Sequence, residues 1–243
     1  MRAADGPLEI ADFLARVAAE LAAAPDEVEL TRCAARRATE LVHGDGSAVV
    51  ARRRRGRLET IAATDGVARR DEALQRELGA GPTLTAVQDP DGLLVEDAAH
   101  DRRWPGWGGR PEAGGPRSLV CVQLMPTGLH DRHEPLGVLA VHALRPGAFG
   151  REDLEVLLLL AVHVSAAWAA LRRTVTLAEA AESRHLIGVA QGMLAASGRV
   201  PLDASFALLQ RWARGGNVRV RDLAERIVAA GGVPHDVDLP DGP

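Results

Sequence analysis

An arginine, a glutamine and two glycines recur along one short segment near the C-terminus. The segment is SRHLIGVAQGML, residues 183–194, and its apolar residues have helical spacing. Gly188 and Gly192 interrupt it, although each glycine costs a helix about 1 kcal/mol relative to alanine. Arg184, Gly188 and Gln191 fall on one flank of the apolar face. A bare helix backbone beside an amide and a guanidinium suits the edges and faces of unpaired RNA bases.

The charges around this segment also suit a polyanion. Residues 183–231 contain seven arginines and three acidic residues, a net charge of +4, whereas the whole chain has a net charge of −4. Arg219 and Arg226 are seven residues apart and would share a stripe on a later helix, where they could neutralise phosphates. A structural explanation stays open, in which the glycines allow close helix packing and the arginines form a solvated face.

Other chemically capable residues form no complete site. His130 and His133 are three apart in a predicted loop, but no third metal ligand is implied. Cys121 and His142 lie on predicted strands, where burial for structural reasons explains them better than a heme or redox pocket. The run 52–55, four arginines, is interpreted as a solvated hairpin tip rather than a nucleic-acid patch. No phosphate-binding loop, nucleophile elbow or paired-carboxylate signature stands out, so we predict no metal, no cofactor and no catalysis.

The elements that must position these residues begin with a mixed N-terminal region. Helical periodicity changes to strand patterns and back, which predicts an α+β sheet domain over residues 1–150. The expected helices cover 8–24, 26–43 and 68–79, and the expected strands cover 47–53, 57–63, 93–97, 118–125 and 136–144. Asp26 is expected to cap the second helix.

A heptad pattern begins after residue 152. Apolar residues recur at steps of four and three, which is typical of a coiled-coil seam. The seam residues are Leu157, Ala161, Val164, Trp168, Leu171, Val175 and Ala178. We therefore expect a helical stalk over 151–182 that forms a homodimer, although the pattern also fits one amphipathic helix packed on its own sheet. The apolar run 156–171 is interrupted by His163 and Ser165 and is too short for a membrane span, so no membrane contact is predicted.

Three short helices are expected in the C-terminal region. They are the continuation of the stalk to about 197, then 202–214 and 218–229. Together they predict a small bundle over 183–232, followed by a disordered tail over 233–243. Asn217 is expected to cap the third helix.

The C-terminal bundle resembles the ANTAR domain of bacterial transcription antiterminators. The resemblance rests on Ser183-Arg184, Ile187-Gly188, the run 190–194, Asp203, the run 206–209, Asn217, Arg219 and the run 221–224. Residues 1–150 look like a GAF domain, as found in actinobacterial GAF–ANTAR proteins. That second resemblance rests on Gly79–Pro82, Val95–Asp97, Asp101–Pro105, Arg117-Ser118 and Arg145–Phe149.

The two resemblances imply a fold and a function. The fold is an α+β GAF sensor domain, an antiparallel sheet flanked by helices, joined by a long coiled-coil-like helix to an all-α three-helix ANTAR bundle. The function is binding of paired hairpin loops in nascent RNA transcripts, which favours transcription past a terminator, controlled by an unidentified small-molecule or protein signal at the GAF domain. The implied RNA-binding residues are Arg184, Gly188, Ala190, Gln191, Gly192, Asn217, Arg219, Arg221 and Arg226.

Other functions stay open beside this one. The helices around residues 215–217 mimic a DNA-binding helix-turn-helix, but the third helix has a broad apolar arc where a recognition helix needs a polar face. A thiol-dependent enzyme would need a reactive, exposed cysteine, and neither Cys33 nor Cys121 has that setting. A GAF sensor acting through protein partners is a further alternative. The two separated cysteines, with no CxxC pair and no signal peptide, predict a reducing cytoplasm.

Overall fold

The computed structural model describes residues 6–108, 114–126, 134–198 and 201–232. The predicted tail over 233–243 and the pair His130 and His133 therefore lie outside the described residues. The chain divides into two compact units, Met1–Leu171 and Arg172–Pro243. Its elements are α1 (Pro7–Ala22), α2 (Glu27–Leu41), β1 (Gly46–Arg52), a 3-10 turn (Arg54–Gly56), β2 (Leu58–Ala63), α3 (Gly66–Leu78), α4 (Pro82–Ala86), β3 (Leu93–Val95), β4 (Ser118–Leu124), β5 (Gly137–Ala143), α5 (Arg151–Gly198), α6 (Leu202–Gly215) and α7 (Val220–Ala230).

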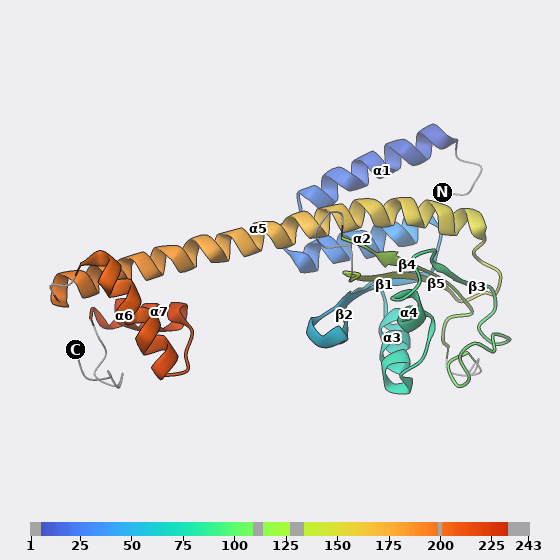
Figure 1. Cartoon of the computed structure of the whole chain (residues 1–243). Helices are drawn as coiled ribbons and strands as arrows, with labels where there is room; N and C mark the ends of the chain where they lie inside the picture. Colours follow the sequence, from blue (N-terminus) through green and yellow to red (C-terminus); the bar gives the residue numbers. More distant parts are fainter. Residues whose placement is uncertain (1–5, 109–113, 127–133, 199–200, 233–243) are drawn as a thin grey trace. The chain divides into compact units, whose positions relative to one another are not determined.

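A five-stranded sheet forms the centre of the first unit (Figure 1). The strand order is β2-β1-β5-β4-β3, and every neighbouring pair is antiparallel. All residues of β5 are buried, and β1 and β4 are buried at all but one position each. Because both faces of these strands are covered, they are recognisable in the sequence as continuous apolar runs rather than as alternating patterns.

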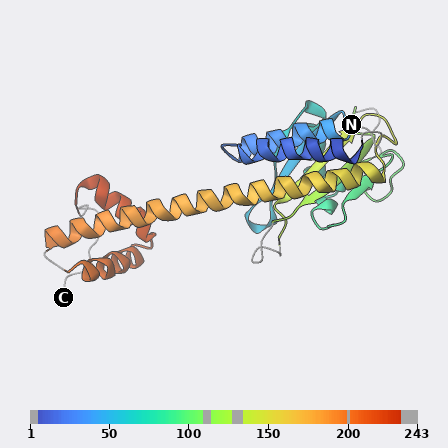
Figure 2. The same cartoon turned by 90° about the horizontal axis from the view of Figure 1, so that it is seen from above.

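Helices cover both faces of the sheet. In Figures 1 and 2, α1, α2 and the first part of α5 lie over one face, and α3 and α4 lie against the other in Figure 1. The larger core, on the first face, includes Leu30 and Val141, and the smaller core, on the second, includes Trp104 and Cys121. The predicted α+β domain with an antiparallel sheet flanked by helices is confirmed.

The first part of α5 packs within its own protomer. Four of the predicted seam residues are at most 3% exposed and belong to the larger core: Leu157, Ala161, Val164 and Trp168. The prediction that these four residues form a contact between two chains is therefore wrong. Their spacing follows from packing a helix on the sheet domain, which requires the same helical stripe as a coiled coil. The other three seam residues, Leu171, Val175 and Ala178, are half-buried or exposed.

By its length and composition alone, α5 could cross a membrane. No other helix among the described residues is long and apolar enough to do so. The apolar character is concentrated in the part of α5 that packs on the sheet domain, where Leu157, Leu160 and Trp168 are fully buried. Core packing therefore accounts for the apolar run. The absence of membrane contact stays a prediction.

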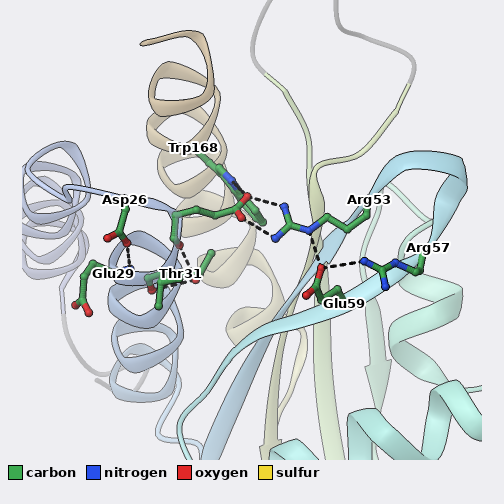
Figure 3. Close-up of polar contacts among 9 residues, drawn as sticks. Asp26, Glu29, Thr31, Arg53, Arg57, Glu59 and Trp168 are labelled. Atoms are coloured by element: carbon green, nitrogen blue, oxygen red, sulfur yellow. Dashed lines mark hydrogen bonds and ion pairs between the residues drawn. The ribbon is translucent and has the colours of Figure 1, made fainter. Parts of the chain in front are cut away.

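A polar network connects α2, the β1–β2 hairpin and α5 (Figure 3). The indole Nε1 of Trp168 donates a hydrogen bond to Glu27 Oε1 at 2.9 Å. Arg53 donates to both carboxylate oxygens of Glu27, at 3.0 and 2.7 Å, and its Nε lies 3.0 Å from Glu59 Oε2. Arg57 also reaches Glu59, at 3.5 Å. The arginine run is therefore more than a solvated hairpin tip, because Arg53 holds the hairpin against α2.

Three helices pack around one small core in the second unit. The core residues are Ala190, Leu194, Leu209, Ala213, Leu223, Ala224 and Ile227, which come from the end of α5, from α6 and from α7. The predicted all-α bundle is confirmed. Its third helix begins later than predicted, because Arg219 is the N-cap residue of α7. Asn217 instead has a left-handed conformation, with φ of 50°, in the turn before α7.

Candidate nucleic-acid interface and sensor cavity

The two glycines of α5 face open space. Gly188 and Gly192 are exposed, and a Cβ atom added to either would meet nothing within 4 Å among the described residues. Close helix packing therefore does not explain them. An exposed helix flank without side chains lets another molecule approach the backbone, and it is present despite the cost of glycine in a helix.

Polar side chains border this flank of α5. Arg184 is exposed and Gln191 is half-buried, four residues before and three residues after Gly188. These spacings place the three residues on one side of a helix. Ala190 is fully buried in the bundle core, so its prediction as an RNA-binding residue is wrong. An alanine within a glycine-rich motif resembles a contact position in the sequence, but the helical register turns it toward α6 and α7.

The arginines of α7 do not form one uniform group. Arg219 and Arg226 are exposed, whereas Arg221 is half-buried. Arg221 Nη2 lies 2.8 Å from Glu182 Oε2 on α5, so this arginine already has an acidic partner. Glu182 and Gly188 are six residues apart on α5 and lie on opposite flanks of its core-facing stripe. The structure therefore groups Arg184, Gly188 and Gln191 but places Arg221 on the other flank.

A cavity of about 240 Å³ lies beside α3 in the first unit. We call it the sensor cavity. It is lined by Val67, Arg70, Asp71, Leu74, Trp107, Gly108, Gly114, Gly115, Pro116 and Arg117. Most of these residues present apolar side chains or bare backbone, and among these described lining residues Asp71 is the one buried charged residue. A concave apolar site with few polar groups is the usual form of a small-molecule pocket.

The carboxyl groups of two adjacent α3 residues, Asp71 and Glu72, are buried. Asp71 is 8% exposed and accepts hydrogen bonds from Trp107 Nε1 at 2.9 Å and from Gln75 Nε2 at 2.7 Å. Glu72 is 3% exposed and accepts one from Thr83 Oγ1 at 2.8 Å. Burial raises the pKa of Asp71 to about 6. Burial, and then the neighbouring Asp71 charge, raise the pKa of Glu72 to about 8.

Cys121 and His142 occupy the sheet next to these acids. Both side chains are buried, as predicted. Burial raises the pKa of the Cys121 thiol, which opposes formation of a reactive thiolate. Burial also lowers the pKa of His142, whose Nε2 lies 3.5 Å from Asp65 Oδ2. Among the residues that the structure describes, no group of three or more His, Cys, Asp or Glu side chains could hold a metal ion.

Family models divide the chain into two recognisable parts. The model of the GAF domain matches residues 24–169, more than half of the chain, and the model of the ANTAR domain matches residues 176–228. The chain is a GAF and ANTAR domain-containing protein. A comparison with curated proteins found no match. Because both families are sensory and regulatory, the protein is a regulator controlled by a sensor domain.

Solved structures share the GAF fold. The GAF domain of a phosphoenolpyruvate-protein phosphotransferase from Coxiella burnetii has a TM-score of 0.56 at 18% identity, covering 71% of this chain and 99% of that one. The corresponding domain from Acinetobacter has a TM-score of 0.52 at 17% identity, covering 70% and 97%. A phytochrome photosensory core module from Stigmatella aurantiaca has a TM-score of 0.57 at 13% identity, covering 85% and 44%. At these identities the similarity shows the fold alone.

The sensor cavity of the GAF domain was missed by sequence reasoning. The α3 sequence, GVARRDEALQREL, has six charged residues, which is typical of a solvent-exposed helix. Its buried polar residues, Asp71, Glu72 and Gln75, are spaced so that they share one face. That spacing, with a glycine and a proline soon afterwards at Gly81 and Pro82, was the available signal for a polar helix face turned inward.

The buried carboxyl groups predict an unusual pH dependence of GAF-domain stability. Because the folded-state pKa of Glu72 is near 8 and its usual value is 4.5, the native state keeps a proton that the unfolded chain loses. Stability is therefore fully present below about pH 4.5 and falls as the pH rises to about 8. We expect Glu72→Gln to remove much of this fall. The difference in Tm between the variant and the wild type should therefore change in favour of the variant as the pH rises from 5 to 8.

The measurement is thermal unfolding followed by circular dichroism across this pH range. Glu77→Gln, on the exposed part of the same helix, is the matched control and should follow the wild-type profile. Parallel pH profiles for wild type and Glu72→Gln would show that Glu72 does not take up a proton on folding.

Proposed function

We propose that the ANTAR domain binds hairpin loops in nascent RNA and favours transcription past a terminator, under control of the GAF domain. The observation that carries this proposal is the exposed side of α5 at Gly188 and Gly192, which we call the glycine flank. Arg184 and Gln191 border it. Bases in a hairpin loop are unpaired, so their edges can approach the bare backbone while an amide and a guanidinium bond or stack beside them. The cytoplasm, where nascent transcripts occur in bacteria, is the proposed location.

The fold of the bundle favours RNA over duplex DNA as the ligand. A recognition helix must present a polar face to the major groove. In α7 the residues Leu223, Ala224 and Ile227 are buried against the other two helices, and α7 has only eleven residues. The exposed glycines instead leave a shallow surface on α5, which suits a loop better than a duplex groove.

The test compares ligands on the full-length chain. Fluorescence anisotropy would measure binding to an RNA with two hairpin loops, to the same sequence with its loops closed by a complementary strand, and to duplex DNA. We expect the two-hairpin RNA to bind at least tenfold more tightly than either duplex at about 200 mM salt. Equal or tighter binding of duplex DNA would instead identify a DNA-binding regulator.

Arg219 is expected to contact one RNA phosphate. It is exposed at the N-cap of α7, where the partial positive charge of the helix terminus adds to its own charge. Arg219→Ala should weaken RNA binding several-fold and make the slope of log K against log salt shallower by about 0.7 to 0.9. Arg69→Ala, which removes an exposed arginine of the GAF domain, is the control and should change neither quantity. An unaltered salt slope for Arg219→Ala would remove this residue from the interface.

We further propose that the protein acts as a homodimer through the second part of the stalk. Leu171, Val175 and Ala178 continue the heptad spacing, and Val175 is 49% exposed. Two bundles held by one dimer could engage two hairpins, which raises the affinity through effective concentration.

Val175→Asp should therefore convert a dimer into a monomer, because the substitution places a charge at an apolar interface position. Light scattering at micromolar concentrations would measure the mass of each variant. Leu177→Asp is the matched control, because Leu177 is 71% exposed and lies off the seam. A wild-type chain that is monomeric at all concentrations tested would refute the stalk dimer.

A further inference from the structure

Among the residues that the structure describes, the sensor cavity has a negative charge on its wall and no buried positive charge to balance it. Asp71 receives only neutral donors, the indole of Trp107 and the amide of Gln75. In the part of the chain that the structure describes, neither Asp71 nor Glu72 forms an ion pair. The raised pKa of Asp71, about 6, has burial as its cause, and at neutral pH this carboxyl group is mostly ionised. Glu72, with a pKa of about 8, keeps its proton there.

The two arginines that line the sensor cavity do not neutralise Asp71. Arg117 donates two hydrogen bonds to Asp97 Oδ1, at 3.2 and 3.0 Å, and its guanidinium is thereby committed to another carboxylate. Arg70 is exposed to solvent at the rim, where water screens its charge. A buried carboxylate without a cationic partner is costly, and a ligand can supply the missing charge.

The remaining walls select the body of such a ligand. Val67, Leu74, Trp107 and Pro116 provide apolar surface, and the face of an indole ring attracts cations. A volume of about 240 Å³ is below the usual range for ligand pockets, which limits the occupant to a compact molecule of about ten non-hydrogen atoms. An anionic ligand would place its charge beside Asp71, and a neutral ligand would leave the Asp71 charge unbalanced.

We propose that the sensor cavity binds a small organic cation, a protonated primary amine with a compact apolar body, whose ammonium group contacts Asp71. This inference rests on the proposed sensor role of the GAF domain and names its ligand class. The ammonium group donates to the free lone pairs of the Asp71 carboxylate, while the apolar body packs against Trp107 and Leu74.

The test is calorimetric titration of the full-length chain at pH 7.5 with matched sets of probes. Phenethylamine and isopentylamine are the amines, 2-phenylethanol and isopentanol are the neutral counterparts, and phenylacetate and 3-methylbutanoate are the anionic counterparts. We expect at least one amine to bind at least tenfold more tightly than its alcohol and its carboxylate. Binding of the carboxylates in preference to the amines, or no binding of either amine, would overturn the proposal.

Two variants locate the binding of the amine. Asp71→Asn, which keeps the shape of the side chain, should weaken amine binding at least tenfold, whereas Asp91→Asn at an exposed position should not. Gly115→Phe adds a large side chain to the wall of the sensor cavity and leaves the Asp71 carboxylate in the sequence, and a Cβ atom at Gly115 meets nothing within 4 Å. If Asp71→Asn does not fold, loss of amine binding in a folded Gly115→Phe variant supports the site, and unchanged binding refutes it. The assay contains no RNA, so its outcome and that of the RNA test are independent.

Discussion

Trp168→Ala is expected to destabilise the GAF domain by about 3–5 kcal/mol, the usual cost of removing a buried aromatic side chain. Trp168 has no exposed surface and belongs to the larger core, which spans α1, α2, the sheet and α5. The substitution also removes the hydrogen bond from the indole to Glu27, whose carboxylate is held by Arg53. The effect should appear in urea-induced unfolding followed by circular dichroism, as a lower midpoint without a change of slope.

Trp168→Phe separates the two contributions, because it keeps most of the apolar volume and removes only the N–H donor. We expect it to cost about 0.5–1.5 kcal/mol, the usual net contribution of one hydrogen bond. The cost stays small because Arg53 still donates to both oxygens of Glu27. Leu177→Ala, at an exposed position farther along α5, should stay within about 0.5 kcal/mol of the wild type. A Trp168→Ala variant with wild-type stability but a halved mass in light scattering would contradict the core position and restore the dimer seam.

Trp168 also shows why the sequence could not distinguish two uses of one helical stripe. Steps of four and three residues arise whenever a helix buries one face, whether the covering surface belongs to the same chain or to a second copy. The pattern therefore predicted the helix and its apolar face correctly. The partner of that face depends on contacts between α5 and residues far away in the sequence, such as Glu27, which lies 141 residues before Trp168.

Strands and helices with strong local signals were predictable from the sequence. The strands β4 and β5 are apolar runs between loops, and Asp26 caps α2 as expected, accepting a hydrogen bond from the Glu29 amide at 2.9 Å. The five-residue helix α4 was missed, since a single turn and a half leaves no periodicity to detect. Its first residue, Pro82, suits a first helical turn, but proline also marks loops.

The candidate sites depended more on tertiary structure. The glycine flank was predictable because Gly188 and Gly192 are costly in a helix and so indicate a local requirement. The burial of Ala190 was not predictable from residue type, because alanine is common both in cores and on surfaces. The sensor cavity needed the three-dimensional structure, since Trp107 contacts Asp71 across 36 residues of sequence. Charged residues on a helix are usually solvated, and only long-range contacts reveal the exceptions.

Gly188→Leu is expected to weaken RNA binding at least tenfold while leaving the ANTAR domain folded. A leucine at this position extends from a flank where a Cβ atom meets nothing within 4 Å, so it does not collide with the bundle. Replacing glycine with leucine in a helix should stabilise it, by about 0.5 to 1 kcal/mol. The new side chain covers the backbone between Arg184 and Gln191, where we propose that the RNA loop approaches.

Anisotropy with the two-hairpin RNA and thermal unfolding of the same samples would measure both effects. Ser197→Leu is the matched control, because Ser197 is exposed on α5 and lies nine residues from Gly188, about half a turn away around the helix. Both variants should be at least as stable as the wild type, and only Gly188→Leu should lose RNA affinity. Because the substitution adds a side chain without removing a charge, a loss of affinity at unchanged salt slope would identify steric exclusion from the flank. Wild-type affinity in the Gly188→Leu variant would place the RNA on another face of the bundle.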